Sequence, residues 1–314
     1  MGWRRQGRGE FRLSDDVLSK ESQLSRIAFI GLGAMGLPMA ANLSASGYEI
    51  AGFDCSASAR DKAASQGLRL SDSMEQAAED ADAVVTMLQN GDQVLSVWEG
   101  MLGLAADALF IDCSTIDLAS ARRAHGLARA RGALSVDAPV SGGVAGAQAG
   151  KLTFMCGAER DAFEKAEPIL QSMGARIVHC GGPGLGQAAK ICNNLMLGVA
   201  MAATAEAFTL AEQLGLSSQA LFDVASVSSG QSWSLTSYCP VAGLTPDSPA
   251  NRGYKAGFQT KLMLKDLRLA EMAAAGSGLE TPMASAAARL YSEFESEGGG
   301  EDDFSGVIQA MRRR

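Results

Sequence analysis

A lysine and two asparagines are closely spaced in the segment GQAAKICNN, residues 186–194. Asn193 and Asn194 follow Lys190 by three and four residues, so on an α-helix all three side chains lie on one face. An amine beside two amides can move a proton and hold a substrate oxygen. The alternative is that Lys190 packs its aliphatic stem in a core and extends its charge to solvent.

One reaction that such an amine could serve is the oxidation of an alcohol with loss of a hydride, which requires a group that accepts the hydroxyl proton. His125 lies in a polar, arginine-rich segment and His179 has no paired carboxylate near it, so both are interpreted as structural. Two histidines and the lack of a CxxC pair argue against an ordinary zinc site, and we expect no metal. A Tyr-x-x-x-Lys pair does not occur. Lys190 remains as the base, because apolar neighbours should lower its pKa, and Asn194 can hold the substrate oxygen or the amine.

The segment GLGAMG, residues 31–36, has the spacing of a dinucleotide-binding turn. It follows the apolar run IAFI, opens a predicted helix, and is followed by a second apolar run that ends in Asp54, 18 residues after Gly36. Asp54 should bind the ribose hydroxyls and repel a 2′-phosphate, which favours NAD, whereas Arg60 leaves NADP open. The alternative is a glycine-rich turn without a ligand. The predicted cofactor contacts are Gly31, Leu32, Gly33, Ala34, Met35, Gly36 and Asp54.

Small polar residues follow three other apolar runs. In DAPVSGG, residues 137–143, the hydroxyl of Ser141 and the N–H groups of Gly142 and Gly143 can form a nest for a carboxylate. The alternative is a plain turn that binds no ligand, which would have the same sequence. In DCST, residues 112–115, Thr115 and Ser114 are candidate contacts for the nicotinamide, and either could instead cap the helix that begins near Asp117. The cap is the role expected for Ser114. The third run ends in TMLQN, residues 86–90, and Gln93 follows it by three residues. Gln93 is either a cofactor contact or a solvated helix residue.

Composition excludes several classes of function. A net charge of −8 and a pI near 4.9 argue against nucleic acid as a partner. Glycine, lysine or asparagine interrupts the apolar runs before they reach the roughly 20 residues of a membrane helix, so we expect no membrane segment. The six cysteines are scattered and are expected to be reduced. Residues 1–24 are expected to be a disordered extension of a cytoplasmic protein, or a transit peptide to the mitochondrial matrix, against which their acidic residues count.

Short apolar runs alternate with helical segments from Arg26 to about residue 184. This alternation predicts an α/β domain, a Rossmann-type doubly wound and mostly parallel sheet, over residues 25–184. Strand signals then stop, and helices are expected at 187–214, 217–226, 259–275, 281–296 and 304–312. Residues 185–314 are therefore predicted to form an all-helical domain for the substrate and for oligomerisation.

Four segments together resemble the β-hydroxyacid dehydrogenase family. They are FIGLGAMGLPMAANL, DAPVSGG, GQAAKICNN and KDLRLA (residues 265–270), in this order and spacing. The resemblance extends over about residues 26–312 and implies a lysine acid/base at the position of Lys190. It also implies substrate contacts at Ser141, Gly142, Gly143 and Asn194, and cofactor contacts at Leu88, Gln89, Gln93, Thr115 and Lys265. Gln89 stands where the nearest relatives usually carry proline, which puts its contact in doubt.

Residues 228–270 are most similar to family members that oxidise 3-hydroxyisobutyrate to methylmalonate semialdehyde in valine catabolism. The resemblance implies that Trp233 and Phe258 shape an apolar wall for the substrate methyl group, although aromatic residues in helices are usually core. It also implies a homodimer or homotetramer through the helical domain. The alternatives are a tartronate semialdehyde or glyoxylate/succinic semialdehyde reductase and, in another class, a non-catalytic dinucleotide-binding protein.

Overall fold

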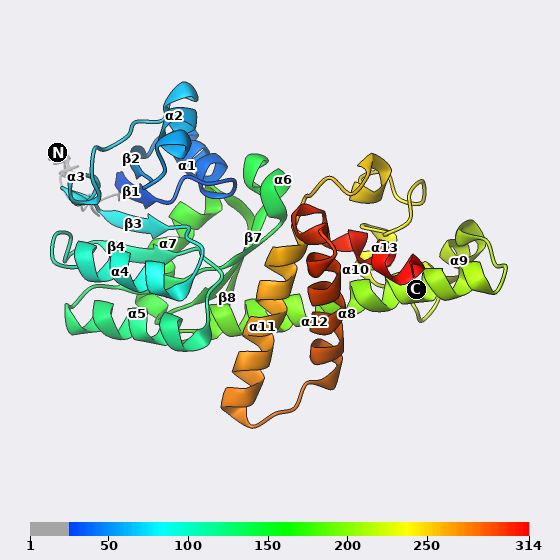
Figure 1. Ribbon diagram of the computed structural model, residues 1–314. Coiled ribbons are helices and arrows are strands. Elements are labelled where there is room, and N and C mark those ends of the chain that lie inside the picture. Colours follow the sequence, from blue (N-terminus) through cyan, green and yellow to red (C-terminus); the bar gives the residue numbers. More distant parts are fainter. Residues whose placement is uncertain (1–24, 314) are drawn as a thin grey trace, which may run out of the picture.

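The computed structural model describes residues 25–313 (Figure 1). The predicted extension at residues 1–24, with its transit-peptide alternative, lies outside the described residues. Within them, an α/β part built on one sheet is followed by a helical part, and the long helix α8 runs from the first into the second (Figure 1).

The sheet of the described residues has eight strands in the order β2-β1-β3-β4-β5-β7-β6, with β8 paired to β7. The strands from β1 to β5 pair in parallel, β7 is antiparallel to β5 and β6, and β8 is parallel to β7. The predicted fold class is confirmed. The strands are β1 Arg26–Ile30, β2 Glu49–Phe53, β3 Ala83–Thr86, β4 Leu109–Asp112, β5 Ser135–Asp137, β6 Val140–Ser141, β7 Leu152–Gly157 and β8 Gly174–Gly181.

Both faces of the central strands are buried, which explains their continuous apolar sequences. Ile27 and Phe29 of β1 belong to a core that includes residues of α1 and α7, whereas Ala28 and Ile30 belong to a second core with residues of α4 and α5. The helices of this part are α1 Gly36–Ala45, α2 Ala57–Ser65, α3 Met74–Ala78, α4 Gly91–Met101, α5 Leu118–Ala130, α6 Gly143–Gln148 and α7 Arg160–Gln171.

The helical part has its own core around Phe208, Tyr291 and Phe304. Its long helices α8, α11 and α12 pack on one another. The predicted helices are present, with shifts of a few residues at their ends. The helices are α8 Leu185–Gln213, α9 Ser218–Ala225, α10 Trp233–Thr236, α11 Thr260–Ser277, α12 Pro282–Ser296 and α13 Val307–Arg312, with short 3-10 turns at Pro249–Arg252, Gly299–Glu301 and Phe304–Gly306.

Two expectations need correction. The apolar run at residues 134–140 is divided between β5 and β6, and β6 runs antiparallel to β7. Helix α8 is, by length and composition, long and apolar enough to cross a membrane, contrary to the expectation that every apolar run is too short. In the structure, however, α8 buries Met201 and Phe208 in the core of the helical part. The predicted division at residue 184 falls in the turn between β8 and α8.

Candidate active site

The glycine turn after β1 has the geometry that a dinucleotide requires. Gly31 has a φ of +98°, and a Cβ there would lie 2.3 Å from the carbonyl oxygen of Met87. A Cβ on Gly36 would lie 1.9 Å from the carbonyl oxygen of Gly31, so only glycine lets α1 pack this closely on β1. A Cβ on Gly33 would meet nothing within 4 Å, and Gly33 and Ala34 are exposed at the start of α1. The exposed N–H groups at this helix start fit a pyrophosphate.

Asp54, just after β2, lies beside this turn. Its Oδ2 accepts a hydrogen bond of 2.7 Å from the Leu32 N–H, and its Oδ1 accepts one of 2.8 Å from the Ser56 N–H. The carboxylate is therefore held in place by the backbone at the edge of the glycine turn. Arg60, which could favour a 2′-phosphate, donates instead to the carbonyl oxygens of Asp54 and Cys55, at 2.6 and 3.2 Å.

Five further predicted cofactor contacts lie at the loops after β3 and β4 or on the helices beside them, α4 and α11. Lys265 of α11 donates from Nζ to the carbonyl oxygens of Thr115 and Gln89, at 2.8 and 3.3 Å. The N–H of Gln89 donates to Oε1 of Gln93 at 3.0 Å. Leu88 borders the glycine turn, since a Cβ on Gly31 would lie 3.1 Å from its Cδ2. Lys265 thus links the helical part to both loops.

Ser114 does not cap a helix, contrary to expectation. Asp117 is the N-cap of α5, and its Oδ1 accepts from the Ser120 N–H at 2.8 Å. The Ser114 hydroxyl donates instead to Oδ1 of Asp112 at 2.6 Å and accepts from the Leu88 N–H at 2.8 Å. It therefore ties the loop after β3 to the loop after β4. Burial raises the pKa of Asp112 to about 6, although the hydrogen bonds from Ser114 and Thr86 lower it.

Lys190 and Asn194 lie on one buried face of α8. Lys190 is 8% exposed, and among the described residues no hydrogen bond joins its Nζ to another group. Asn194 donates from Nδ2 to Oδ2 of Asp266 on α11, and its Oδ1 accepts from Asn193 at 3.0 Å. The amine is thus left for a ligand beside a fixed amide.

Electrostatics around Lys190 favour a titratable amine. Burial lowers the pKa of Lys190, the negative charge of Asp266 raises it, and the positive charge of Lys265 lowers it. Burial has the opposite effect on the carboxyl group of Asp266, whose pKa it raises. The positive charges of Lys190 and Lys265 lower that pKa. Oδ1 of Asp266 is buried without a hydrogen bond and lies 3.8 Å from Nζ of Lys265. Asp266 is joined to the predicted site through its hydrogen bond with Asn194, although the motifs assigned it no role. Its position directly after Lys265 in the segment KDLRLA is the sequence feature that could have indicated this.

The backbone at the proposed carboxylate nest favours glycine. Gly142 and Gly143 have φ values of +134° and +60°, and Ser141 is half-buried at the end of β6. A Cβ on Gly143 would lie 3.6 Å from the carbonyl oxygen of Gly257, so the residue before Phe258 lies against this turn. Among the described residues, no hydrogen bond joins Ser141 to Lys190.

Trp233 and Phe258 belong to one aromatic cluster. Trp233 begins α10, and Phe258 lies in the loop before α11. Trp233 is 52% exposed and stacks on Tyr238, with ring centroids 4.8 Å apart. Tyr238 stacks on Phe304, and Phe258 meets the same ring edge-on at 5.7 Å. Trp233 is therefore a half-exposed residue and not a core residue.

His125 does have a carboxylate partner, but in the interior. Its Nε2 lies 2.8 Å from Oδ1 of Asp137, and its Nδ1 lies 2.7 Å from Oγ of Ser135. Asp137 also accepts from the N–H groups of Gly184 and Gln187 at the start of α8, each at 2.8 Å. The pair therefore anchors the helix that carries Lys190, in keeping with the structural interpretation of His125.

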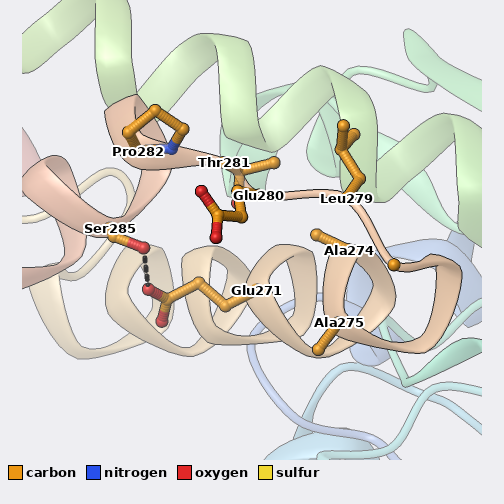
Figure 2. Close-up of a pocket in the computed structure, with 9 residues that line it drawn as sticks. Glu271, Ala274, Ala275, Leu279, Glu280, Thr281, Pro282 and Ser285 are labelled. Atoms are coloured by element: carbon orange, nitrogen blue, oxygen red, sulfur yellow. Dashed lines mark hydrogen bonds between the residues drawn. The ribbon is translucent and has the colours of Figure 1, made fainter.

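A separate pocket lies at the turn between α11 and α12 (Figure 2). Glu271 faces this pocket and accepts a hydrogen bond of 2.7 Å from Ser285, with Glu280 nearby on the turn. None of the predicted site residues lines it. No cluster of possible metal ligands occurs in the part of the chain that the structure describes.

Two family models cover almost all of the described chain. Residues 26–182 match the NAD binding domain of 6-phosphogluconate dehydrogenase. Residues 184–311 match the NAD-binding domain of NADP-dependent 3-hydroxyisobutyrate dehydrogenase.

Three relatives illustrate the similarity. The 3-hydroxyisobutyrate dehydrogenase of Pseudomonas aeruginosa is 43% identical over 298 residues, covering 92% of this chain and 99% of the relative. The NAD-dependent L-serine dehydrogenase of the same organism is 45% identical over 292 residues, covering 92% and 98%. The structure of Mycobacterium tuberculosis 3-hydroxyisobutyrate dehydrogenase with L-serine has a TM-score of 0.88 at 46% identity, covering 92% and 99%.

The relatives match along nearly their whole length, and the glycine turn fits the dinucleotide that their names and the models imply. The chain belongs to the β-hydroxyacid dehydrogenase family and is an NAD-dependent oxidoreductase that acts on a small molecule.

Proposed function

We propose that the protein oxidises 3-hydroxyisobutyrate to methylmalonate semialdehyde, a step of valine catabolism, with Lys190 as general base. The observation that carries the proposal is a buried amine without a hydrogen-bond partner among the described residues, on the same helix face as Asn194. The names of the relatives support the substrate class. Bound NAD would accept the hydride that leaves the alcohol carbon.

Each protein group has a distinct role in this proposal. Neutral Lys190 takes the proton of the substrate hydroxyl as the carbonyl forms, and returns it in the reverse reaction. Asn194, held by Asp266, orients the substrate oxygen. Ser141 and the N–H groups of Gly142 and Gly143 bind the carboxylate. Trp233 and Phe258 shape the wall for the methyl group.

The first prediction concerns Lys190→Ala, which should lower kcat by roughly 10² to 10⁴ because a positioned acid/base is lost. NADH binding, measured by fluorescence titration, should persist. Lys190→Arg is the matched control: it keeps the positive charge but cannot be deprotonated at neutral pH, so it should be as inactive as the alanine variant. Wild-type turnover in either variant would contradict the assignment.

A second candidate function is oxidation of L-serine, which the name of one close relative favours. The two candidates differ at one position, where the substrate carries a methyl or an ammonium group. An apolar pocket separates substrates that differ by one methyl group by only about 1 to 3 kcal/mol, or roughly 10- to 200-fold. 3-Hydroxypropionate, which lacks the methyl group, should therefore be turned over, but less well than 3-hydroxyisobutyrate. L-Serine should also be a weaker substrate, because an apolar wall would not solvate its ammonium group.

The test is kcat/KM with NAD for 3-hydroxyisobutyrate, 3-hydroxypropionate, L-serine and D-glycerate, repeated in Ser141→Ala. We expect 3-hydroxyisobutyrate to rank first and the Ser141 variant to raise KM for all four acids. If L-serine ranked first, the second candidate would replace the first, and if D-glycerate did, a tartronate semialdehyde reductase would. Turnover of none of the four would favour a non-catalytic protein.

A further inference from the structure

A buried glutamine joins the helix that carries Lys190 to the loop after β4. Gln187, in the first turn of α8, is fully buried. Its Nε2 donates to the carbonyl oxygen of Ser114 at 2.7 Å, and its Oε1 accepts from the N–H of Ile116 at 3.2 Å. One side-chain amide therefore satisfies a backbone acceptor and a backbone donor on either side of Thr115. Of the side chains that are always uncharged, only an amide offers both a strong donor and a strong acceptor at fixed spacing.

The backbone of Gln187 is itself held firmly. Its N–H donates to Oδ2 of Asp137 at 2.8 Å, while Oδ1 of the same carboxylate accepts from the N–H of Gly184. A Cβ on Gly186 would lie 2.3 Å from the carbonyl oxygen of Met155 and 2.5 Å from that of Asp137. The first turn of α8 thus packs directly on β5 and β7, and the side chain of Gln187 extends from a fixed base.

A second helix of the helical part, α11, holds the loop as well. Nζ of Lys265 on α11 donates to the carbonyl oxygen of Thr115 at 2.8 Å. Side chains of α8 and α11 therefore bind three backbone groups of this loop: the carbonyl oxygens of Ser114 and Thr115 and the N–H of Ile116. Lys190 follows Gln187 by three residues, about one helical turn, so the base and the loop share one short rigid connection.

We propose that Gln187 is a positioning residue for the reaction. It holds the loop at residues 114–116, and with it Thr115 at the cofactor site, at a fixed separation from Lys190. This inference rests on the proposed roles of Lys190 and Thr115. A displacement of about 1 Å between reacting groups can cost roughly 10²-fold in rate, so a loop that loses both bonds should slow hydride transfer.

The experiment follows the first turnover of the full-length enzyme, measured as the pre-steady-state burst of NADH absorbance after mixing with excess NAD and either 3-hydroxyisobutyrate or L-serine, whichever is oxidised. Gln187→Met keeps the length of the side chain but removes both hydrogen bonds. We expect the rate constant of NADH formation to fall roughly 10- to 100-fold while its amplitude per enzyme is retained. Deuterium at the hydroxymethyl carbon verifies that the observed step is hydride transfer.

A merely structural role would act on the amplitude, because it changes the fraction of folded enzyme and not the rate constant of that fraction. Ser135→Ala is the matched control. It removes only the hydrogen bond between Ser135 and His125, the histidine whose other ring nitrogen contacts Asp137. It should lower Tm and leave the rate constant unchanged. Gln187→Glu is the second variant: its carboxylate keeps the acceptor for Ile116 but loses the donor to Ser114, and it should be slowed as well.

An unchanged rate constant in both Gln187 variants, or a loss confined to the amplitude, would overturn the inference. The outcome for Lys190→Ala separates this failure from failure of the proposed function. If Lys190→Ala is inactive and Gln187→Met has the wild-type rate constant, only the positioning role is wrong. If Lys190→Ala turns over normally, the assignment of the base is wrong and the positioning role has no basis.

Discussion

At the scale of single residues, the pKa of Lys190 depends on two opposing contributions. Burial lowers the pKa of this amine, and the charge of Asp266 raises it again. Only the neutral amine can accept the substrate proton, so the rate of oxidation should rise as the pH rises through the pKa of Lys190. The rate of reduction should fall over the same interval, because it needs the protonated amine.

The second prediction follows from this balance. Asp266→Asn removes the negative charge that stabilises the protonated amine, so the pKa of Lys190 should fall further. The acid limb of kcat/KM for oxidation should therefore move to lower pH. Glu271→Gln is the matched control, because it removes the same charge from the same helix at a residue that hydrogen-bonds Ser285. It should leave the acid limb of the pH profile where it is in the wild type. A shift of the limb to higher pH in Asp266→Asn would contradict the assignment.

The third prediction concerns the choice of cofactor. The carboxylate of Asp54 is fixed by the N–H groups of Leu32 and Ser56, beside the glycine turn. It should repel the 2′-phosphate of NADP, so kcat/KM should be much higher with NAD, and Asp54→Ser should narrow the difference. Arg60→Ala should change the ratio little, because Arg60 donates to backbone carbonyls. Equal values for NAD and NADP in the wild type would count against the role of Asp54.

The sequence predicts site residues best where local spacing decides. Lys190 and Asn194 are four positions apart on one helix, so their common face follows from helical periodicity alone. Asp266 is 72 residues from Asn194, and Gln187 is 71 residues from Ile116. Contacts of this kind depend on how α11 and the loop after β4 pack against α8, which no local pattern reveals. Ser114 was misassigned for a partly different reason: its hydroxyl donates to Asp112, only two residues before it, and accepts from the N–H of Leu88, 26 residues away.

At the scale of elements, a buried carboxylate organises the loop that carries Phe258. Asp303 is fully buried, and its Oδ2 accepts from the Tyr238 hydroxyl and from the N–H groups of Gly257 and Phe258, at 2.9 to 3.0 Å. Its Oδ1 accepts from the N–H and the hydroxyl of Ser305. This residue therefore joins the C-terminal segment to two parts of the aromatic cluster.

The fourth prediction is that Asp303→Ala lowers the free energy of unfolding by about 3 kcal/mol or more, because each buried donor left unsatisfied costs roughly 1 to 3 kcal/mol. Urea unfolding measures the change. KM for the hydroxy acid should also rise, since Gly257 lies against the turn at Gly143. Asp302→Ala is the neighbouring control and should have wild-type stability. Equal stability of the two variants would show that the Asp303 hydrogen bonds contribute little.

The elements themselves were largely predictable. Apolar runs bounded by glycine gave the strands, and long apolar periodicity gave α8, α11 and α12. The reversal at β6 was not predictable, because a strand of two residues, Val140–Ser141, has no periodicity and its direction is set by pairing with β7. The short helix α10 was missed as well, since four residues carry little pattern beyond the cap at Ser232.

At the scale of the whole molecule, side chains of the helical part complete the cofactor side of the sheet. Lys265 reaches the loops after β3 and β4, and Gln187 reaches the latter from α8. The same α8 continues far beyond these contacts and carries α9 at its distal end, away from the sheet (Figure 1). No residue of α9 is buried. Leu221, Phe222 and Ala225 of α9 are partly buried against the core of the helical part, whereas Val224 is exposed. An exposed apolar surface of this kind is expected to be covered by another surface.

The fifth prediction is that a second copy of the chain supplies this cover, giving a homodimer or homotetramer. Leu214, Val224 and Val227 are 75%, 64% and 84% exposed at this end of the molecule, and they offer an apolar surface that two copies could share. Light scattering after size exclusion should give a multiple of the 32.5 kDa chain mass for the wild type. Val224→Glu combined with Val227→Glu should reduce that mass, because each buried carboxylate would lack a partner.

Met283→Glu tests where the interface lies. Met283 is 63% exposed at the turn between α11 and α12, so this variant places the same charge on an apolar site at a different end of the helical part. It should leave the oligomer intact. If Met283→Glu dissociates the protein and the α9 variant does not, the interface lies at the α11–α12 turn. A wild-type monomer at all concentrations would rule out self-association, and the exposed face of α9 would then need a different partner.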